Sequence, residues 1–203
     1  MNTMTHASEI ATASPGRPRG FDEDAVLAIA LRVFWEKGYE AASLEALTTA
    51  MSINRSSFYN CFGSKHGVLL AALKSYSEGA LKRFSAIAEP SSQQTMMALL
   101  TALANPAGGT NGCLLVNCIT ELAPHDPEVL RLGSRHIAQL QSILARKLSP
   151  KDPETAIATA GALLALAIGT LTMRKSGQTS EQIEATLQQA ERLTAGFLQP
   201  AAD

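Results

Sequence analysis

The chain has 203 residues, of which 46% are hydrophobic and 17% are charged, and this is the composition of a globular protein rather than a disordered one. Its formal net charge is -1 at pH 7, so no overall positive charge draws the protein to nucleic acid or to an acidic membrane. Any surface that binds anions must therefore be local. Three cysteines without the spacing of a disulfide framework indicate reduced thiols and a cytoplasmic location.

Two segments bear on membrane targeting or insertion. Residues 1–20 lack a continuous apolar stretch and are not expected to act as a signal peptide. Residues 155–173 contain no charged residue and are about long enough to span a bilayer. Threonine and glycine interrupt this segment, so we expect a helix that is buried on nearly all sides within the protein, and no membrane association.

The first helices are expected directly after residue 20. Asp22 predicts the N-terminus of a helix that runs to about Lys37, where Gly38 ends it. Ser43 predicts the start of a short second helix, whose apolar residues recur at helical spacing. Strand signals are nearly absent here and in the rest of the chain.

A turn at residues 51–53 separates the second helix from a third one. Asn54 is expected to cap this third helix, which extends to Cys61. Ser64 is expected to cap a long fourth helix over residues 65–88. Two short helices joined by a tight turn, with an amphipathic helix before them, describe a helix-turn-helix unit.

Five further helices are expected in the remainder of the chain. Two Asp-Pro-Glu sequences, at 126–128 and 152–154, place Asp at an N-cap and Pro at the first helical position. The sequence from Thr179 to Gln182 matches a capping box. The five helices are expected at residues 92–104, 113–122, 127–148, 153–175 and 180–197. The sequence therefore predicts an all-α protein of about nine helices.

The third helix of a helix-turn-helix unit enters the major groove of DNA, and its outward side chains read base edges. Arg55 can bond guanine in two places, and Asn60 can pair with adenine or hold a phosphate. The outward hydroxyl groups, a type that commonly holds phosphate oxygens, belong to Ser56, Ser57 and Tyr59. The alternative interpretation is three ordinary amphipathic helices with polar exteriors.

Residues 21–76 resemble the DNA-binding domain of the tetracycline-repressor (TetR) family of bacterial transcriptional regulators. Phe34, Gly38 and Tyr39 match the pattern that this family shows at the end of its first helix. The run 58-FYNCFGSK-65 matches the family's recognition helix and the start of the helix after it. These motifs in this order are highly specific for the family.

The resemblance implies which residues contact DNA. Phe58 and Phe62 are expected to point inward. Ser52 stands where the family usually has glycine in the turn, and Cys61 stands where an aromatic residue or histidine is common. The expected contacts are Ser43, Tyr59 and Lys65 with the DNA backbone, and Asn54, Arg55, Ser56, Ser57 and Asn60 with bases or nearby phosphates.

Residues 1–20 end in the basic, proline-stiffened sequence 15-PGRPRG-20. Arg17 and Arg19 in this flexible arm are of the kind that can enter a minor groove. The alternative is a solvated tail without a DNA contact.

The resemblance also implies that residues 77–203 form an effector-binding and dimerisation domain. In the eighth expected helix, Ala158, Ala162, Ala165 and Gly169 recur at spacings that let another helix approach closely. We therefore expect the last two helices to form a four-helix bundle with those of a second copy. Such a homodimer would read a roughly palindromic operator. The alternative is a helix buried within its own subunit.

The sequence Gly112-Cys113, at the expected start of the sixth helix, resembles that of a TetR subgroup whose members include sensors of reactive electrophiles or oxidants. The helix N-terminus lowers the pKa of a thiol and favours the thiolate. Arg174 or Lys175 would add positive charge if the fold brings it close. The alternative is that Cys113 is a small buried hydrophobic residue.

Three further residues are candidates for effector binding: Met96, Asn117 and His136. His136 lies at the shoulder of the apolar stripe of the seventh helix, where the alternative is a satisfied histidine at the edge of the core. His125 and His136 lie at no recognisable ligand spacing, so no metal site is expected. No cofactor is expected.

No Ser-His-Asp order, phosphate loop or pair of carboxylates indicates an enzyme. We expect a homodimeric DNA-binding repressor, released from its double-stranded operator by a small-molecule or thiol-reactive effector that the sequence does not identify. One alternative is an all-α scaffold that binds a partner protein without specific DNA binding. Another is a small enzyme that uses Cys113 as its nucleophile.

Overall fold

The computed structural model describes residues 22–89, 95–105 and 109–195, and within these ranges all regular secondary structure is helical. The all-α prediction is therefore confirmed. Arg17, Arg19 and the expected helix start at residue 92 lie outside the described residues. The elements are α1 (Glu23–Ala41), α2 (Leu44–Ala50), α3 (Arg55–Phe62), α4 (Lys65–Ala88), α5 (Met96–Ala104), α6 (Leu114–Leu122), α7 (Pro127–Leu148), α8 (Ile157–Lys175) and α9 (Ser180–Ala195), with two short 3-10 helices, η1 (Gly109–Asn111) and η2 (Pro153–Ala156).

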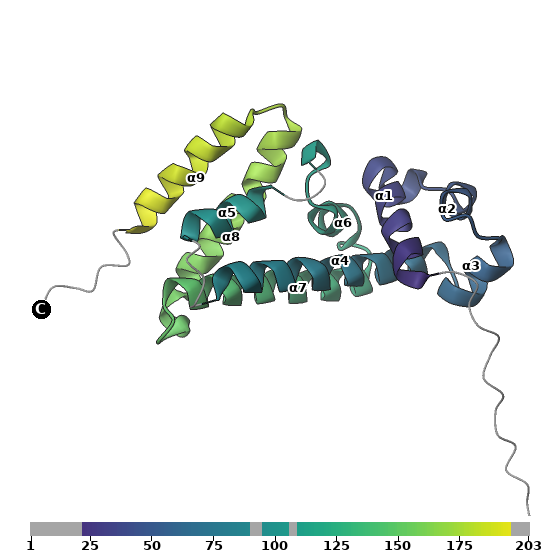
Figure 1. Ribbon diagram of the computed structural model, residues 1–203, viewed down its shortest axis with the longest axis horizontal. Coiled ribbons are helices and arrows are strands. Elements are labelled where there is room, and N and C mark those ends of the chain that lie inside the picture. The colour runs from purple at the N-terminus through teal and green to yellow at the C-terminus, as the bar shows by residue number, and fades with distance from the viewer. Residues whose placement is uncertain (1–21, 90–94, 106–108, 196–203) are drawn as a thin grey trace, which may run out of the picture.

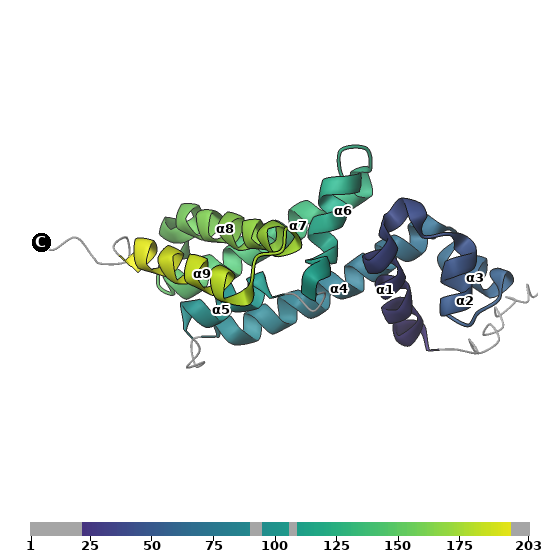
Figure 2. The ribbon, with the colours of Figure 1, turned by 90° about the horizontal axis from the view of Figure 1, so that it is seen from above.

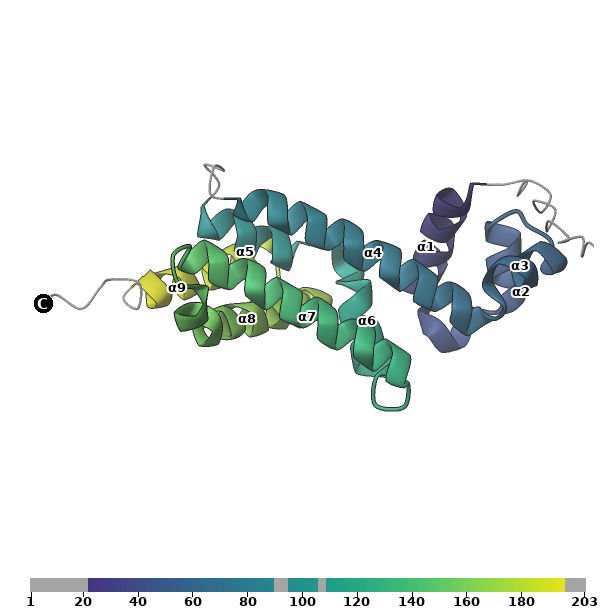
Figure 3. The same cartoon turned by 90° about the horizontal axis from the view of Figure 1, so that it is seen from below.

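The molecule is elongated, with α1, α2 and α3 at one end and α9 toward the other (Figure 1). The long helix α4 leads from the small end into the larger group of helices, where it lies beside α7 (Figure 3). Helices α8 and α9 pack against each other at the far end (Figure 2). The expected domain boundary at residue 76 lies inside the continuous helix α4, and it stays a prediction.

Polar side chains set most of the helix starts, as the sequence predicts. Each of these side chains accepts a hydrogen bond from a backbone N–H of the first turn, which would otherwise lack a partner. The residues that cap helices in this way are Asp22, Ser43, Asn54, Ser64, Thr95 and Asp126, of which the sequence did not predict Thr95. The capping box before α9 is also present, because Thr179 N–H donates to Gln182 Oε1 at 2.8 Å and Gln182 N–H to Thr179 Oγ1 at 3.3 Å.

The expected cap at Asp152 is wrong. The Asp152 side chain makes no capping bond, residues 153–156 form the 3-10 helix η2, and the α-helix begins only at Ile157. The Thr155 hydroxyl donates to the Asp152 backbone carbonyl oxygen at 2.8 Å, within the tighter turn of η2. Short 3-10 turns are common at α-helix N-termini, and the Asp-Pro-Glu pattern does not distinguish them from an α-helical start.

Two backbone conformations shape the helix-turn-helix unit. Gly38 has φ 76° and interrupts α1 at the position where the sequence predicts its end. Ser52, in the turn between α2 and α3, has φ 53° and is the one residue other than glycine with positive φ in the described chain. The left-handed turn that favours glycine is therefore built here with serine, at a conformational cost.

The described residues form two hydrophobic clusters. The first fills the helix-turn-helix end, where Phe34 and Phe58 are fully buried, and it continues into α6 through Leu115. The second lies among α5, α7, α8 and α9 and includes Leu100 and Leu144. Because α6 packs in the first cluster, a shift of α6 would displace side chains of the helix-turn-helix unit that contact it.

Helix α8 is less buried than expected. Residues 153–175 contain an 18-residue window with a mean hydropathy of 1.9 and form the one described helix that could cross a membrane by length and composition, a test that core helices of soluble proteins also pass. The helix packs against α5, α7 and α9 on one side. Its stripe of small residues is exposed in the single chain, and the stripe consists of Ala158, Ala162, Ala165 and Gly169. Burial on nearly all sides is therefore wrong for the single chain, because no element among the described residues covers this stripe.

Candidate functional site

The outer surface of α3 carries the residues that the sequence predicts to face DNA. Phe58 and Phe62 are buried and hold the helix against α1, α2 and α4, as expected. Tyr59 points outward with half of its surface exposed. The other polar residues of this surface, which are exposed except for the half-buried Ser57, are Arg55, Ser56, Ser57 and Asn60. The orientation is confirmed, and the individual DNA contacts stay predictions.

Ser43 and Asn54 already have a structural role in the absence of DNA. The Ala46 N–H donates to Ser43 Oγ at 3.0 Å, and the Ser57 N–H donates to Asn54 Oδ1 at 2.8 Å. In both residues the acceptor oxygen caps a helix, while the Ser43 O–H and the Asn54 amide N–H remain available as donors to a phosphate. The two caps therefore position α2 and α3 and still present donors at their N-termini.

Lys65 is held near the end of α1 rather than extended into solvent. Its ammonium donates to the Glu40 carbonyl oxygen at 3.2 Å and lies 4.4 Å from the centre of the Tyr39 ring. The two contacts join the start of α4 to residues 39–40, next to the recognition helix. An ammonium has three N–H donors, so Lys65 could contact a phosphate while it keeps its bond to the Glu40 carbonyl oxygen.

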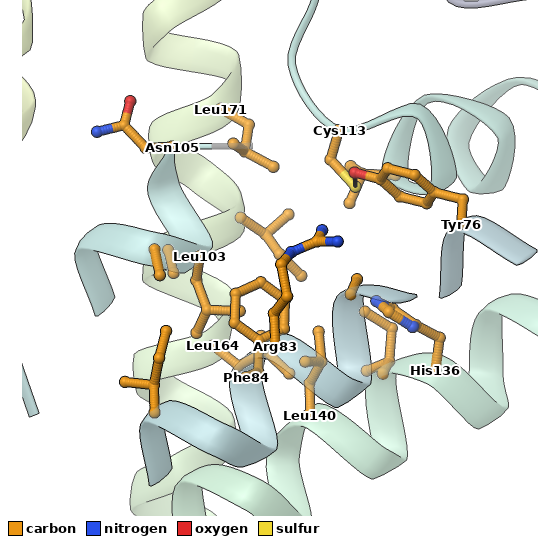
Figure 4. A pocket seen from close by; sticks show the side chains of 17 residues that line it. Tyr76, Arg83, Phe84, Leu103, Asn105, Cys113, His136, Leu140, Leu164 and Leu171 are labelled. Carbon is orange, nitrogen blue, oxygen red and sulfur yellow. Dashed lines mark hydrogen bonds between the residues drawn. The ribbon is translucent and has the colours of Figure 1, made fainter. Parts of the chain in front are cut away.

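A cavity of about 290 Å³ lies among α4, α5, α7 and α8, beside the start of α6 (Figure 4). Its walls are mainly apolar and include Phe84, Leu103, Leu140, Leu164 and Leu171. The polar side chains that line it are Tyr76, Arg83, Asn105, Cys113 and His136. A concave, apolar site with a few convergent polar groups is the usual form of a small-molecule site.

Cys113 lies at the N-cap of α6, where its thiol makes no capping bond and instead lines the cavity. The Tyr76 hydroxyl donates to Cys113 Sγ at 3.3 Å. The Tyr76 ring also packs edge-on against Trp35 of α1, with the ring centres 5.3 Å apart. Burial, and then the neighbouring Cys113, raise the pKa of Tyr76, so its phenol stays protonated and remains a donor.

The loop before Cys113 joins three parts of the fold. Trp35 Nε1–H donates to the Gly112 carbonyl at 3.1 Å, which ties α1 to this loop. The Lys175 ammonium donates to Asn117 Oδ1 at 2.6 Å, and Asn117 Nδ2–H donates to the Asn111 carbonyl at 3.0 Å. Lys175 therefore lies close to the start of α6, which the sequence had left open, whereas the Arg174 guanidinium donates to Ser180 Oγ at 3.3 Å.

Gly112 is required by this arrangement for two reasons. Its φ is 72°, in the left-handed region, and a Cβ at this position would lie 3.0 Å from Lys175 Cε. A larger residue would be strained and would also move the Lys175 side chain.

The four candidates for effector binding do not all meet at the cavity. Cys113 and His136 line it, whereas Asn117 holds the preceding loop and Met96 packs on the second hydrophobic cluster without lining the cavity. His136 is only 4% exposed, and its Nδ1 lies 2.7 Å from Ser77 Oγ. Burial lowers the pKa of His136 to about 4, so the ring is neutral at pH 7.

The sequence reasoning missed Trp35, Tyr76 and Arg83. No short motif marks them, because they come together only when α1, α4 and the loop before α6 pack. The single tryptophan, on an otherwise ordinary amphipathic helix, is the one sequence signal for this contact, because a partly buried indole N–H needs a hydrogen-bond partner. Among the described residues, no group of three or more His, Cys, Asp or Glu is arranged to hold a metal ion.

Comparison with known proteins identifies the family. Residues 26–72 match the family described as bacterial regulatory proteins, tetR family. The chain is 35% identical over 132 residues to the uncharacterized HTH-type transcriptional regulator YezE of Bacillus subtilis (strain 168), which covers 62% of this chain and 68% of the relative. It is 31% identical over 153 residues to the HTH-type transcriptional repressor ComR of Escherichia coli (strain K12), which covers 70% and 73% of the two chains.

A solved structure gives the same result for the fold. A cysteine mutant of the TetR family transcriptional regulator CifR, complexed with a 26-bp double-strand operator DNA, is similar with a TM-score of 0.73 and 27% identity. The similarity covers 87% of this chain and 98% of that chain. The helix-turn-helix unit, the helical second part and these relatives agree, and the chain belongs to the TetR family of bacterial transcriptional regulators.

Proposed function

We propose that this regulator is a homodimeric repressor in the cytoplasm that leaves its operator when a small molecule occupies the cavity or an electrophile modifies Cys113. The position of Cys113 carries the proposal. Its thiol lines the cavity and accepts a hydrogen bond from Tyr76, whose ring contacts Trp35 of α1. An event in the cavity therefore acts on the helix-turn-helix unit through direct contacts.

The DNA surface of the proposal is the exposed side of α3. Arg55 and Asn60 read base edges in the major groove, and the hydroxyls of Ser56, Ser57 and Tyr59 hold phosphates. The capped N-termini of α2 and α4 add backbone N–H donors for phosphates near Ser43 and Lys65. Repression is supported by the 31% identical repressor ComR, and operator binding by the CifR structure with its DNA.

The second copy of the chain packs on the exposed face of α8. The stripe that begins at Ala158 and ends at Gly169 consists of small residues and is uncovered in the single chain. Such a stripe lets two helices approach closely, and α8 and α9 of both copies together make a four-helix bundle. In this proposal residues 21–76 form the DNA-binding domain, and residues 77–203 form the domain that binds the effector and makes the dimer.

Release requires that the effector favours a conformation with lower affinity for the operator, because equal affinity for both conformations shifts nothing. Two contacts between the parts of the protein are placed to differ between such conformations. One is the Trp35 to Gly112 hydrogen bond. The other is the contact of His66 Nε2 with Asp126 Oδ2 at 2.6 Å, which joins the start of α4 to the N-cap of α7.

The experiment uses fluorescence anisotropy of the full chain on DNA from directly upstream of its own gene, with and without iodoacetamide. Cys61 is half-buried in α3 and Cys118 is buried, so alkylation has to be assigned to one thiol. We expect alkylation to abolish selective binding in the wild type and in Cys61→Ser, and to leave it unchanged in Cys113→Ser.

Two results would contradict the covalent route. Loss of binding that persists in Cys113→Ser and disappears in Cys61→Ser would mean that alkylation acts on the DNA surface itself. Wild-type binding that is indifferent to iodoacetamide, with Cys113 shown to be alkylated by mass spectrometry, would remove Cys113 as a switch and leave a non-covalent effector.

A further inference from the structure

Among the described residues that line the cavity, one side chain carries a formal charge. These residues include neither Asp nor Glu. His136 adds no charge at pH 7, because burial lowers its pKa to about 4. The charge is that of the Arg83 guanidinium.

Arg83 has no ionic or hydrogen-bonding partner among the described residues. No ion pair and no hydrogen bond between described residues involves the Arg83 guanidinium. In Figure 4 the side chain extends along the cavity with its guanidinium on the side of Tyr76 and Cys113. Arg83 is exposed overall, so its guanidinium is accessible to solvent and to a ligand.

We propose that the cavity binds a small amphipathic acid, with its carboxylate on Arg83 and its apolar body among Phe84, Leu103 and Leu140. The inference rests on the proposed function, since it names the chemical class of the effector for the same cavity. One water occupies about 30 Å³ of the liquid, so a volume of about 290 Å³ fits a molecule of about ten non-hydrogen atoms.

The chemistry of the cavity selects an acid over a neutral or cationic molecule. The guanidinium presents two parallel N–H groups that match the two oxygens of a carboxylate, and the apolar walls are suited to contact the rest of the molecule. A cation would meet Arg83 without a carboxylate to neutralise it. A purely inorganic anion would leave the walls formed by Phe84 and Leu140 in contact with water.

Isothermal titration calorimetry of the full chain without DNA tests the inference. The probes are straight-chain carboxylic acids of six to ten carbons and 4-phenylbutanoate, each paired with its primary amide, at pH 7.5. Acid and amide have the same number of non-hydrogen atoms, so their difference isolates the charge. Wild type is compared with Arg83→Gln, and the matched control is Lys82→Gln, because Lys82 is an exposed neighbour that does not line the cavity.

We expect at least one acid to bind wild type about tenfold or more tightly than its amide. Arg83→Gln should lose this preference with the amide affinity unchanged, and Lys82→Gln should keep it. Arg83→Lys should retain only part of it, because an ammonium lacks the planar fork. The inference is overturned if acid and amide bind wild type equally or if Arg83→Gln keeps the preference. It is also overturned if no acid binds with a dissociation constant below about 1 mM.

Binding to DNA is measured separately, so the two proposals fail independently. A wild-type protein that prefers acids and binds no operator would contradict the proposed function and leave the acid site standing. Selective operator binding without any preference for acids would contradict the acid site alone.

Discussion

Replacing Trp35 by Phe tests the link between the helix-turn-helix unit and the cavity. The substitution keeps an aromatic ring against Tyr76 but removes the indole N–H that donates to the Gly112 carbonyl at 3.1 Å. Gly112 is buried, so water cannot readily replace the lost indole donor at its carbonyl oxygen. An unsatisfied buried carbonyl costs about 1–3 kcal/mol, and we expect the free energy of unfolding to fall by that amount.

The assay is urea unfolding of the full chain, followed by circular dichroism because Trp35 is the only tryptophan. Variants are compared at equal protomer concentration, since a dimer's stability depends on it. Tyr59→Phe is the control, because it removes one polar group from a half-exposed aromatic side chain of the same unit. Its effect should stay within about 0.5 kcal/mol.

The same variant should weaken the coupling between effector and DNA. If the Trp35 to Gly112 bond transmits the state of the cavity, the ratio of operator affinities with and without effector should move toward one in Trp35→Phe. A change in stability below about 0.5 kcal/mol, together with an unchanged affinity ratio, would refute the reasoning.

Three further substitutions have defined outcomes. Gly112→Ala should destabilise the fold by about 1–2 kcal/mol in urea unfolding, and by more than Gly109→Ala, because φ is positive at both but a Cβ meets Lys175 only at Gly112; equal costs would rule out the Lys175 contact as a cause. Ser52→Gly should raise the free energy of unfolding by about 0.5–1 kcal/mol, since φ 53° strains serine and the entropy cost of glycine offsets only part of the relief; a less stable variant would contradict this. The folded pKa of His136 lies near 4, below the usual 6.5, so its contribution to stability is complete above pH 6.5 and is lost as pH falls toward 4, by about 3 kcal/mol. Wild type should therefore lose more stability than His136→Asn over this range of pH, and parallel curves would show that His136 does not titrate as described.

Local signals in the sequence were sufficient for most of the helix starts. Ser43, Asn54 and Ser64 cap helices as expected, because a short polar side chain satisfies the first-turn N–H groups whatever the tertiary context. Asp152 shows the limit of this reasoning. Its pattern is a valid start for a helix, but the chain turns more tightly there and enters the α-helix four residues later.

The cavity was harder to predict than the DNA surface. Arg55 and Asn60 lie on one short helix whose Phe58 and Phe62 face the core, so the pattern of apolar residues was enough to predict that both are exposed. The charge of Arg83 and the thiol of Cys113 come from different helices, and only packing brings them to one cavity. The sequence left two alternatives for the stripe of small residues on α8, since an uncharged helix has the same composition whether its own chain or a second copy covers it.

Sequence-selective binding to an operator is the central claim, and one titration tests it most directly. Anisotropy of labelled DNA from upstream of the gene, against the same DNA with scrambled sequence, is measured at several salt concentrations for wild type and Arg55→Ala. We expect wild-type affinity to fall steeply with salt and to favour the operator, and Arg55→Ala to lose about 1–3 kcal/mol of that discrimination. Equal affinity for both DNAs across upstream and other genomic fragments, or a discrimination that Arg55→Ala leaves intact, would contradict the account.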